Sequence, residues 1–123
     1  MPEASDPTSV LLPGRQGLLV RLTCKEGMRA AMLDRLNAYA DGLAEEPGTE
    51  MYLVSVDPEN ANLVWLYEIF RDADAQNEHR AATGFADLMG ELPDLLDGPP
   101  AVLAMEPLRM SVQDHLLTED WTL

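Results

Sequence analysis

The chain has 123 residues, of which 46% are hydrophobic, and this length suits one domain with a substantial core. Its 22 acidic residues outnumber 8 lysines and arginines, which gives a formal net charge of −14 at pH 7. A surface with this excess of negative charge repels nucleic-acid phosphates and anionic membranes, so neither is an expected partner. The single cysteine, Cys24, excludes an intrachain disulfide.

The N-terminal residues lack the basic start and apolar segment of a signal peptide. No apolar run approaches the roughly 20 residues that are needed to span a bilayer. We therefore expect a cytoplasmic protein.

The first half of the chain predicts an arm, a strand and a helix. Residues 1–16 contain three prolines and few large apolar side chains, which indicates a flexible N-terminal arm. Gly17–Cys24 follows as the first strand. From Glu26 to Glu46 the apolar residues recur in steps of three and four, which predicts a helix. Pro47 and Gly48 end that helix. Its apolar stripe consists of Met28, Met32, Leu36, Tyr39, Ala40 and Leu43.

The middle of the chain predicts a β-hairpin. Thr49–Val56 and Leu63–Phe70 are rich in branched and aromatic residues, and Asp57–Asn62 between them is a dense cluster of turn residues. Asp72 is a suitable N-cap for a second helix, which we expect to break near Gly84 and then resume.

The end of the chain predicts a last strand and a docked tail. Pro93 and the Gly98–Pro100 cluster mark the exit from the second helix, and 101–110 forms the fourth strand. The predicted order is β-α-β-β-α-β, the ferredoxin-like arrangement of the α+β class, with a four-stranded antiparallel sheet in a domain spanning 17–110. The tail 111–123 carries much apolar surface and should dock on its own or a partner subunit. Its large apolar residues are Leu116, Leu117, Trp121 and Leu123.

The predicted strands are apolar on both faces. In Leu63–Phe70, alternate residues point in opposite directions, and Glu68 is the single charged residue of either set. Two helices cover only one face of a four-stranded sheet, and the other face would be an unusually large exposed apolar patch. We therefore expect a two-fold homodimer whose sheets pack face to face.

The residues resemble the antibiotic biosynthesis monooxygenase (ABM) family, a dimeric α+β barrel superfamily. The resemblance covers 17–110 and rests on the "EPG" sequence followed by Tyr52, on Glu68 in the third strand, and on "DADAQNEH" with His79 in the second helix, followed by Phe85. The strand motif departs from the family pattern, because Phe70 stands where a tryptophan is common. The residues used by the haem-degrading branch are absent, which disfavours haem cleavage.

The resemblance implies a monooxygenase that needs no metal, flavin or haem and oxidises a small polyphenolic or quinol-like ring. His79 is then the candidate catalytic residue, because an unperturbed imidazole pKa of about 6.5 suits removal of a phenolic proton near neutral pH. The candidate substrate-binding residues, expected to stack on the ring or hydrogen-bond to it, are Tyr52, Trp65, Tyr67, Asn62 and Phe85.

Each of these assignments has a structural alternative. His79 would otherwise be a helix histidine paired with Glu78 or Glu68, and Asn62 would cap a turn. The aromatic residues would pack in the core and the dimer interface. Glu68, among apolar neighbours, must be paired or have a raised pKa. Its possible partners are Arg21, Arg71 and Arg109.

The chain as a whole has an alternative function too. The same dimer would bind an apolar small molecule without oxidising it. Two histidines and one cysteine, far apart in sequence, make no recognisable metal set.

Overall fold

The core of the molecule is a four-stranded antiparallel sheet. The computed structural model describes residues 7–118. Strands β2 (Gln16–Thr23), β3 (Thr49–Val56), β4 (Leu63–Phe70) and β5 (Ala101–Met105) pair in the order β3-β4-β2-β5. This sheet and its helical connections confirm the predicted α+β, ferredoxin-like fold.

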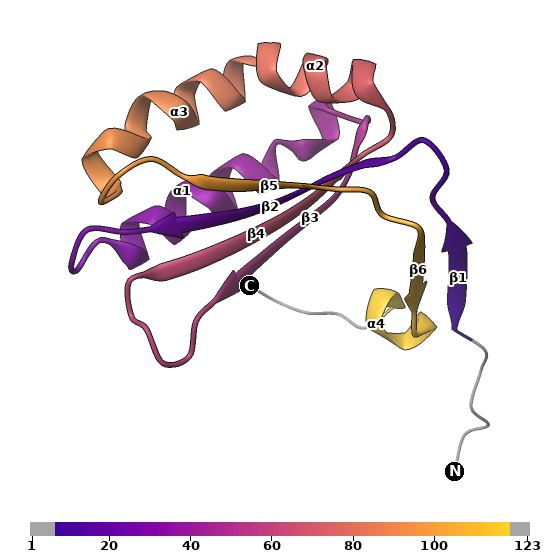
Figure 1. Ribbon diagram of the computed structural model, residues 1–123, viewed down its shortest axis with the longest axis horizontal. Coiled ribbons are helices and arrows are strands. Elements are labelled where there is room, and N and C mark those ends of the chain that lie inside the picture. Colours follow the sequence, from indigo (N-terminus) through magenta and orange to yellow (C-terminus); the bar gives the residue numbers. More distant parts are fainter. Residues whose placement is uncertain (1–6, 119–123) are drawn as a thin grey trace.

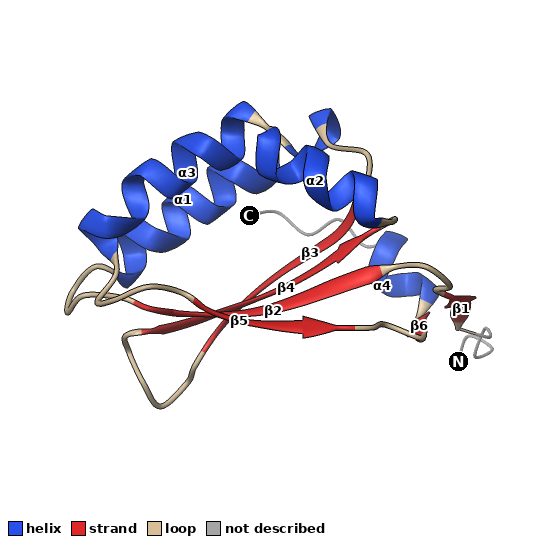
Figure 2. Cartoon of the chain, turned by 45° about the horizontal axis from the view of Figure 1, so that its top comes forward, coloured by secondary structure: helices blue, strands red, loops and turns tan. Residues whose placement is uncertain are grey.

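All three long helices lie on one face of this sheet (Figure 1, Figure 2). They are α1 (Arg29–Asp41), α2 (Ala73–Ala81) and α3 (Thr83–Leu95), and a 3₁₀ helix, η1 (Leu43–Glu45), follows α1. The core forms where helices and sheet meet, since both present their apolar faces there. Its buried members are Val20, Leu22, Cys24, Met32, Leu36, Val64, Leu66, Leu92, Leu95 and Leu96.

The helix boundaries differ from the sequence-based expectation. In place of the predicted helix Glu26–Glu46, the structure has the shorter helix α1, which ends at Asp41. The 3₁₀ helix η1 then leads to the Pro47–Gly48 turn. The second helix breaks at Ala82, which is extended, two residues before the predicted Gly84. Pro93 lies inside the last turn of α3, where its missing N–H removes a single helical hydrogen bond.

The start of α2 follows the predicted chemistry. The Asp72 carboxylate accepts a hydrogen bond of 2.8 Å from the backbone N–H of Ala75, as an N-cap does. This cap fixes the first turn of α2 above the end of β4. It therefore sets the direction in which α2 presents its buried residues to the sheet.

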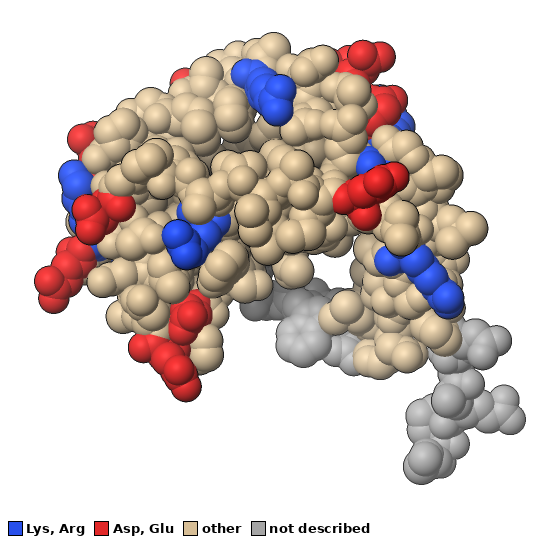
Figure 3. Space-filling model, viewed as in Figure 1, with Lys and Arg blue, Asp and Glu red and all other residues tan. Residues whose placement is uncertain are grey.

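A separate two-stranded ribbon joins the ends of the described chain. β1 (Thr8–Leu11) pairs antiparallel with β6 (Arg109–Val112), and the short helix α4 (Asp114–Thr118) follows. Figure 1 places the ribbon at one end of the sheet, and Figure 3 shows a space between it and the body. The predicted flexible arm 1–16 thus contains a strand, and the predicted fourth strand is divided into β5 and β6. Of the tail residues, Trp121 and Leu123 lie outside the described part.

The sheet face opposite the helices is apolar. Cross-strand register places Leu19, Tyr67, Leu53 and Leu103 in one row on this face, with Trp65 beside them. Leu53 and Leu103 are 53% and 57% exposed. Within residues 7–118, no helix is both long and apolar enough to cross a membrane.

Candidate functional site

His79 occupies the centre of the space between α2 and the sheet. Its side chain is buried, with 5% of its surface exposed. The imidazole packs between two aromatic rings, with centroid distances of 4.9 Å to Phe70 on β4 and 4.6 Å to Phe85 on α3. These rings hold the plane of the imidazole, so its two nitrogens face fixed partners.

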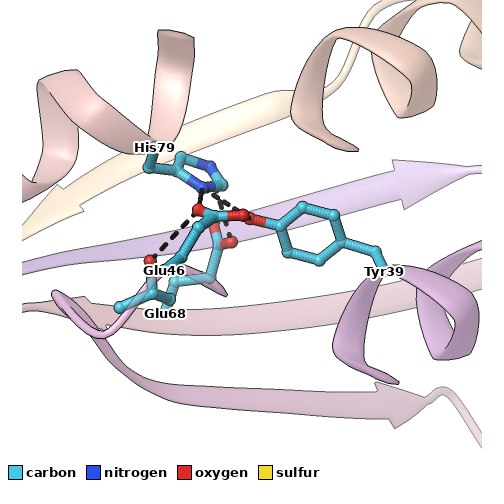
Figure 4. A network of polar contacts seen from close by, with 5 residues as sticks. Tyr39, Glu46, Glu68 and His79 are labelled. Atoms are coloured by element: carbon cyan, nitrogen blue, oxygen red, sulfur yellow. Dashed lines mark hydrogen bonds and ion pairs between the residues drawn. The ribbon is translucent and has the colours of Figure 1, made fainter. Parts of the chain in front are cut away.

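The Nδ1 side of His79 faces a carboxylate and a phenol (Figure 4). Nδ1 lies 2.8 Å from Glu46 Oε1 and 2.6 Å from the hydroxyl of Tyr39. The Tyr39 hydroxyl lies 2.9 and 2.8 Å from the two carboxylate oxygens of Glu46 and donates to them. Burial and the nearby Glu46 carboxylate raise the pKa of Tyr39 above its usual range, so the phenol keeps its proton.

These contacts assign the tautomer of the neutral ring. A carboxylate oxygen at 2.8 Å requires a donor, so Nδ1 carries a proton and donates to Glu46. Nε2 then has a free lone pair. This is how a carboxylate orients a basic imidazole in many active sites.

The Nε2 side of His79 faces a second carboxyl group. Glu68 Oε1 lies 3.9 Å from Nε2, and the Glu68 residue is 6% exposed. Burial raises the pKa of Glu68 from 4.5 to about 7, and repulsion from Glu46 adds to the effect. Near neutral pH, Glu68 can therefore carry a proton.

Tyr52 completes the group beneath the helices. It lies directly opposite Glu68 in the β3–β4 register, and its ring centroid is 5.4 Å from that of Tyr39. Among the described residues, its hydroxyl is the fully buried side-chain polar atom that lacks a hydrogen-bond partner. Buried polar groups are normally paired, so this free donor is a candidate contact for a ligand.

Two depressions lie near the buried group. A cleft of about 490 Å³ lies at the β2–β5 edge, where Leu18, Ala104 and Gln76 line it. Leu18 is the cross-strand neighbour of Glu68, and Gln76 is one turn before His79 on α2. A smaller hollow of about 200 Å³ opens between α1 and the α2–α3 junction, and Tyr39 and Glu46 line it.

The antibiotic biosynthesis monooxygenase family matches residues 16–91, which include β2, β3, β4, α1 and α2. The chain belongs to this family. No curated protein matches it at a significant level.

Solved structures share the ABM fold. Rv0793 from Mycobacterium tuberculosis is 23% identical with a TM-score of 0.70, over 76% of this chain and 95% of that one. PA3566 from Pseudomonas aeruginosa is 20% identical with a TM-score of 0.69, over 87% and 99%. NE2512 from Nitrosomonas europaea is 26% identical with a TM-score of 0.66, over 75% and 87%.

The ABM fold brings some of the predicted site residues together and separates others. His79, Tyr52 and Phe85 lie together beneath the helices. Trp65 and Tyr67 lie on the opposite face of the sheet, because they alternate with the residues that face the helices. A role for those two in substrate binding stays a prediction.

Asn62 is remote from His79, at the β3–β4 turn. Its backbone carbonyl accepts a hydrogen bond of 2.8 Å from the N–H of Cys24, and its own N–H donates to the side chain of Asn60. These contacts support the turn itself. Its predicted contact with a substrate is likewise untested.

Two members of the cluster in this ABM chain were not predicted as site residues. From the sequence, Tyr39 fits the apolar stripe of a helix and Glu46 the end of that helix. The sequence feature that could have indicated Glu46 is its place directly before the "PG" turn, because a carboxylate at this position reaches under the helices. The arginines suggested for Glu68 lie elsewhere: Arg21 is on the open face, Arg71 pairs with Asp72, and Arg109 contacts Ser9.

The described residues 7–118 contain no group of three or more histidine, cysteine, aspartate and glutamate side chains arranged to hold a metal ion. The polar groups of the cluster lie within hydrogen-bonding distance of one another on the Nδ1 side of His79.

Proposed function

We propose that this ABM protein is a cofactor-independent monooxygenase that oxidises a small polyphenolic or quinol-like aromatic with molecular oxygen. The observation that carries the proposal is the buried His79 imidazole, whose Nδ1 donates to Glu46 and whose Nε2 has a free lone pair. A phenol bound against Nε2 would lose its proton to this nitrogen. His79 is the proposed base, and Glu46 is a positioning residue.

The reaction needs no electron carrier other than the substrate. The substrate anion passes electrons to oxygen, a carbon–oxygen bond forms, and the resulting peroxide anion takes up a proton to become a hydroperoxide. The carbon that bears the peroxide then loses its hydrogen as a proton, the O–O bond breaks, and the departing hydroxide takes up a proton to leave as water. One oxygen atom becomes the carbonyl of a quinone, and the other becomes water, so atoms and electrons balance.

The proposed binding region is the cleft at the β2–β5 edge, extended inward beneath α2. Its volume of about 490 Å³ lies in the range of small-molecule sites. Leu18 and Gln76 separate it from Glu68 and His79, so ligand entry requires these two side chains to move. Tyr52 would then offer its unpaired hydroxyl, and Phe85 a ring edge, to an aromatic ligand.

We also propose that two copies pack through the open sheet face. Leu53, Leu103 and Met105 are 53%, 57% and 40% exposed there, beside the half-buried Leu19 and Trp65. An apolar sheet face of this kind is unusual on a monomer. The dimer would cover this face. The helices, beneath which His79 is buried, would stay on the outside of each subunit.

The experiment is oxygen uptake with a panel of hydroquinones and anthrones. His79→Ala is expected to lower turnover by about 10²–10⁴-fold, as for loss of a general base, with the fold and assembly unchanged. Glu78→Gln is the matched control, because Glu78 is exposed on the same helix. Full activity in His79→Ala would overturn the proposal.

The oxygen-uptake measurement also distinguishes the monooxygenase from the second candidate function, binding of an apolar molecule without oxidation. An apolar binding module would show saturable binding of the rings and no oxygen uptake. The buried Tyr52 hydroxyl, which lacks a hydrogen-bond partner, supports this alternative, because it can hold a ligand without any chemical step.

A further inference from the structure

The buried cluster reaches from one surface depression towards the other. At the outer end, Glu46 and Tyr39 line the hollow between α1 and the α2–α3 junction. At the inner end, Glu68 lies next to Leu18, which lines the cleft at the β2–β5 edge. His79 lies between these ends and contacts both (Figure 4).

The polar atoms between the two ends form a short series. Glu46 Oε1 is 2.8 Å from Nδ1 of His79, and the imidazole connects Nδ1 with Nε2. Nε2 is 3.9 Å from Glu68 Oε1, which a small side-chain movement would shorten to a hydrogen bond. The Tyr39 hydroxyl, 2.6 Å from Nδ1, joins the same series from α1.

The charges of the cluster suit the movement of a proton. The groups that face His79 and Glu68 are Tyr39 from α1, Glu46 from the turn before β3, and Tyr52 from β3. Two carboxyl groups in one buried site do not both ionise easily, and the burial that raises the pKa of Glu68 to about 7 lets it gain or lose a proton near neutral pH. Glu46, with 14% of its side chain exposed, can exchange protons with the solvent.

We propose that Glu46, His79 and Glu68, assisted by Tyr39, form a proton path between the outer hollow and the inner end of the substrate cleft. Its purpose rests on the proposed function. A proton taken from a phenol beneath α2 would enter at Glu68 or Nε2 of His79 and leave through Glu46. The ligand end could then stay closed to water during the reaction.

The path is tested on the ligand-free protein by the exchange rate of the His79 ring proton with solvent, followed by NMR of ¹⁵N-histidine-labelled protein. Glu46→Gln removes the outer proton acceptor and is expected to slow the exchange about a hundredfold. Tyr39→Phe should slow it less, because the direct Glu46–His79 contact remains. Glu45→Gln is the control, because Glu45 lines the same hollow but has no contact with His79 in the described structure.

A rescue experiment separates a proton path from a structural role. In Glu46→Ala, added formate should restore the exchange rate, because a small carboxylate fits the 200 Å³ hollow beside Tyr39. Exchange that is unchanged in Glu46→Gln, or slowed in Glu46→Ala without any rescue by formate, would overturn the path. Neither result depends on oxygen uptake, so failure of the path is distinguishable from failure of the monooxygenase proposal.

Discussion

Glu68 is a carboxyl group placed where the fold would favour an apolar residue. It alternates on β4 with Val64, Leu66 and Phe70 on the face beneath the helices, and it is 6% exposed. Burial of a carboxylate costs free energy, and the nearby Glu46 adds repulsion. The protein therefore stabilises the protonated form of Glu68.

The raised pKa predicts how stability depends on pH. The unfolded chain releases this proton near pH 4.5, whereas the folded chain keeps it to about pH 7. Between these values the folded state binds more protons, so the contribution of Glu68 to the free energy of unfolding falls as pH rises. Relative to the Glu68→Gln variant, the free energy of unfolding of the wild type should fall by about 3 kcal/mol across this pH window. Above the window the difference should not change further.

This prediction is checked by urea unfolding of both proteins at fixed concentration from pH 4.5 to 8. The other titrating groups contribute to both proteins and largely cancel in the difference. A difference that stays constant over the whole range would show that Glu68 has an ordinary pKa.

Individual site residues were only partly predictable from the sequence. His79 was recognisable because a histidine on a helix of the family pattern is a candidate base. Tyr39 and Glu46 were not, because their positions fit an apolar stripe and a helix end equally well. Their meeting with His79 depends on how α1 and α2 cross the sheet, which no local pattern specifies.

At the scale of elements, the turn between η1 and β3 brings Glu46 under α2. Gly48 in this turn lies against α2 so closely that an added Cβ would be 2.5 Å from the Cβ of Ala75. Its carbonyl accepts a hydrogen bond of 2.8 Å from the N–H of Arg71. The turn and the start of α2 are therefore one packed unit, and Gly48 allows the close approach.

Gly48→Ala is expected to destabilise the protein by about 1–3 kcal/mol, because Ala75 or the turn must move. The matched control is Gly90→Ala in α3, where an added Cβ meets nothing within 4 Å. This change should stabilise the helix by about 0.5–1 kcal/mol. Thermal unfolding of the two variants measures both effects, and equal stability of the two would contradict the packing described here.

The main strands and helices were largely predictable, because their apolar residues recur with the spacing of a strand or a helix. The hairpin Thr49–Phe70 and the capped start of α2 follow directly from residue pattern and turn chemistry. β1 was not predicted, because its four residues lie between Pro7 and Pro13 and resemble a loop. Its pairing partner, β6, is almost the whole chain away, and local propensity contains no information about such a contact.

At the scale of the molecule, the open sheet face supports the proposed dimer. Light scattering at micromolar concentration should give twice the mass of the chain. Leu103→Asp places a charge in the proposed interface and should shift the mass towards that of one chain. Asn77→Asp, on the exposed surface of α2, is the control and should leave the mass unchanged.

A single-chain mass for the unaltered protein would contradict the dimer. Trp65 offers a second check, since it lies half-buried on this face. Its fluorescence should change on dilution if the face is covered by another subunit and uncovered as the subunits separate.

The β1–β6 ribbon has a consequence for synthesis on the ribosome. Thr8 leaves the ribosome long before its partner Val112 does. The sheet and helices can assemble while β1 still has nothing to pair with, so the ribbon should close only once β6 has emerged. A protease added to chains stalled before β6 emerges would then cut near β1 while leaving the central sheet intact.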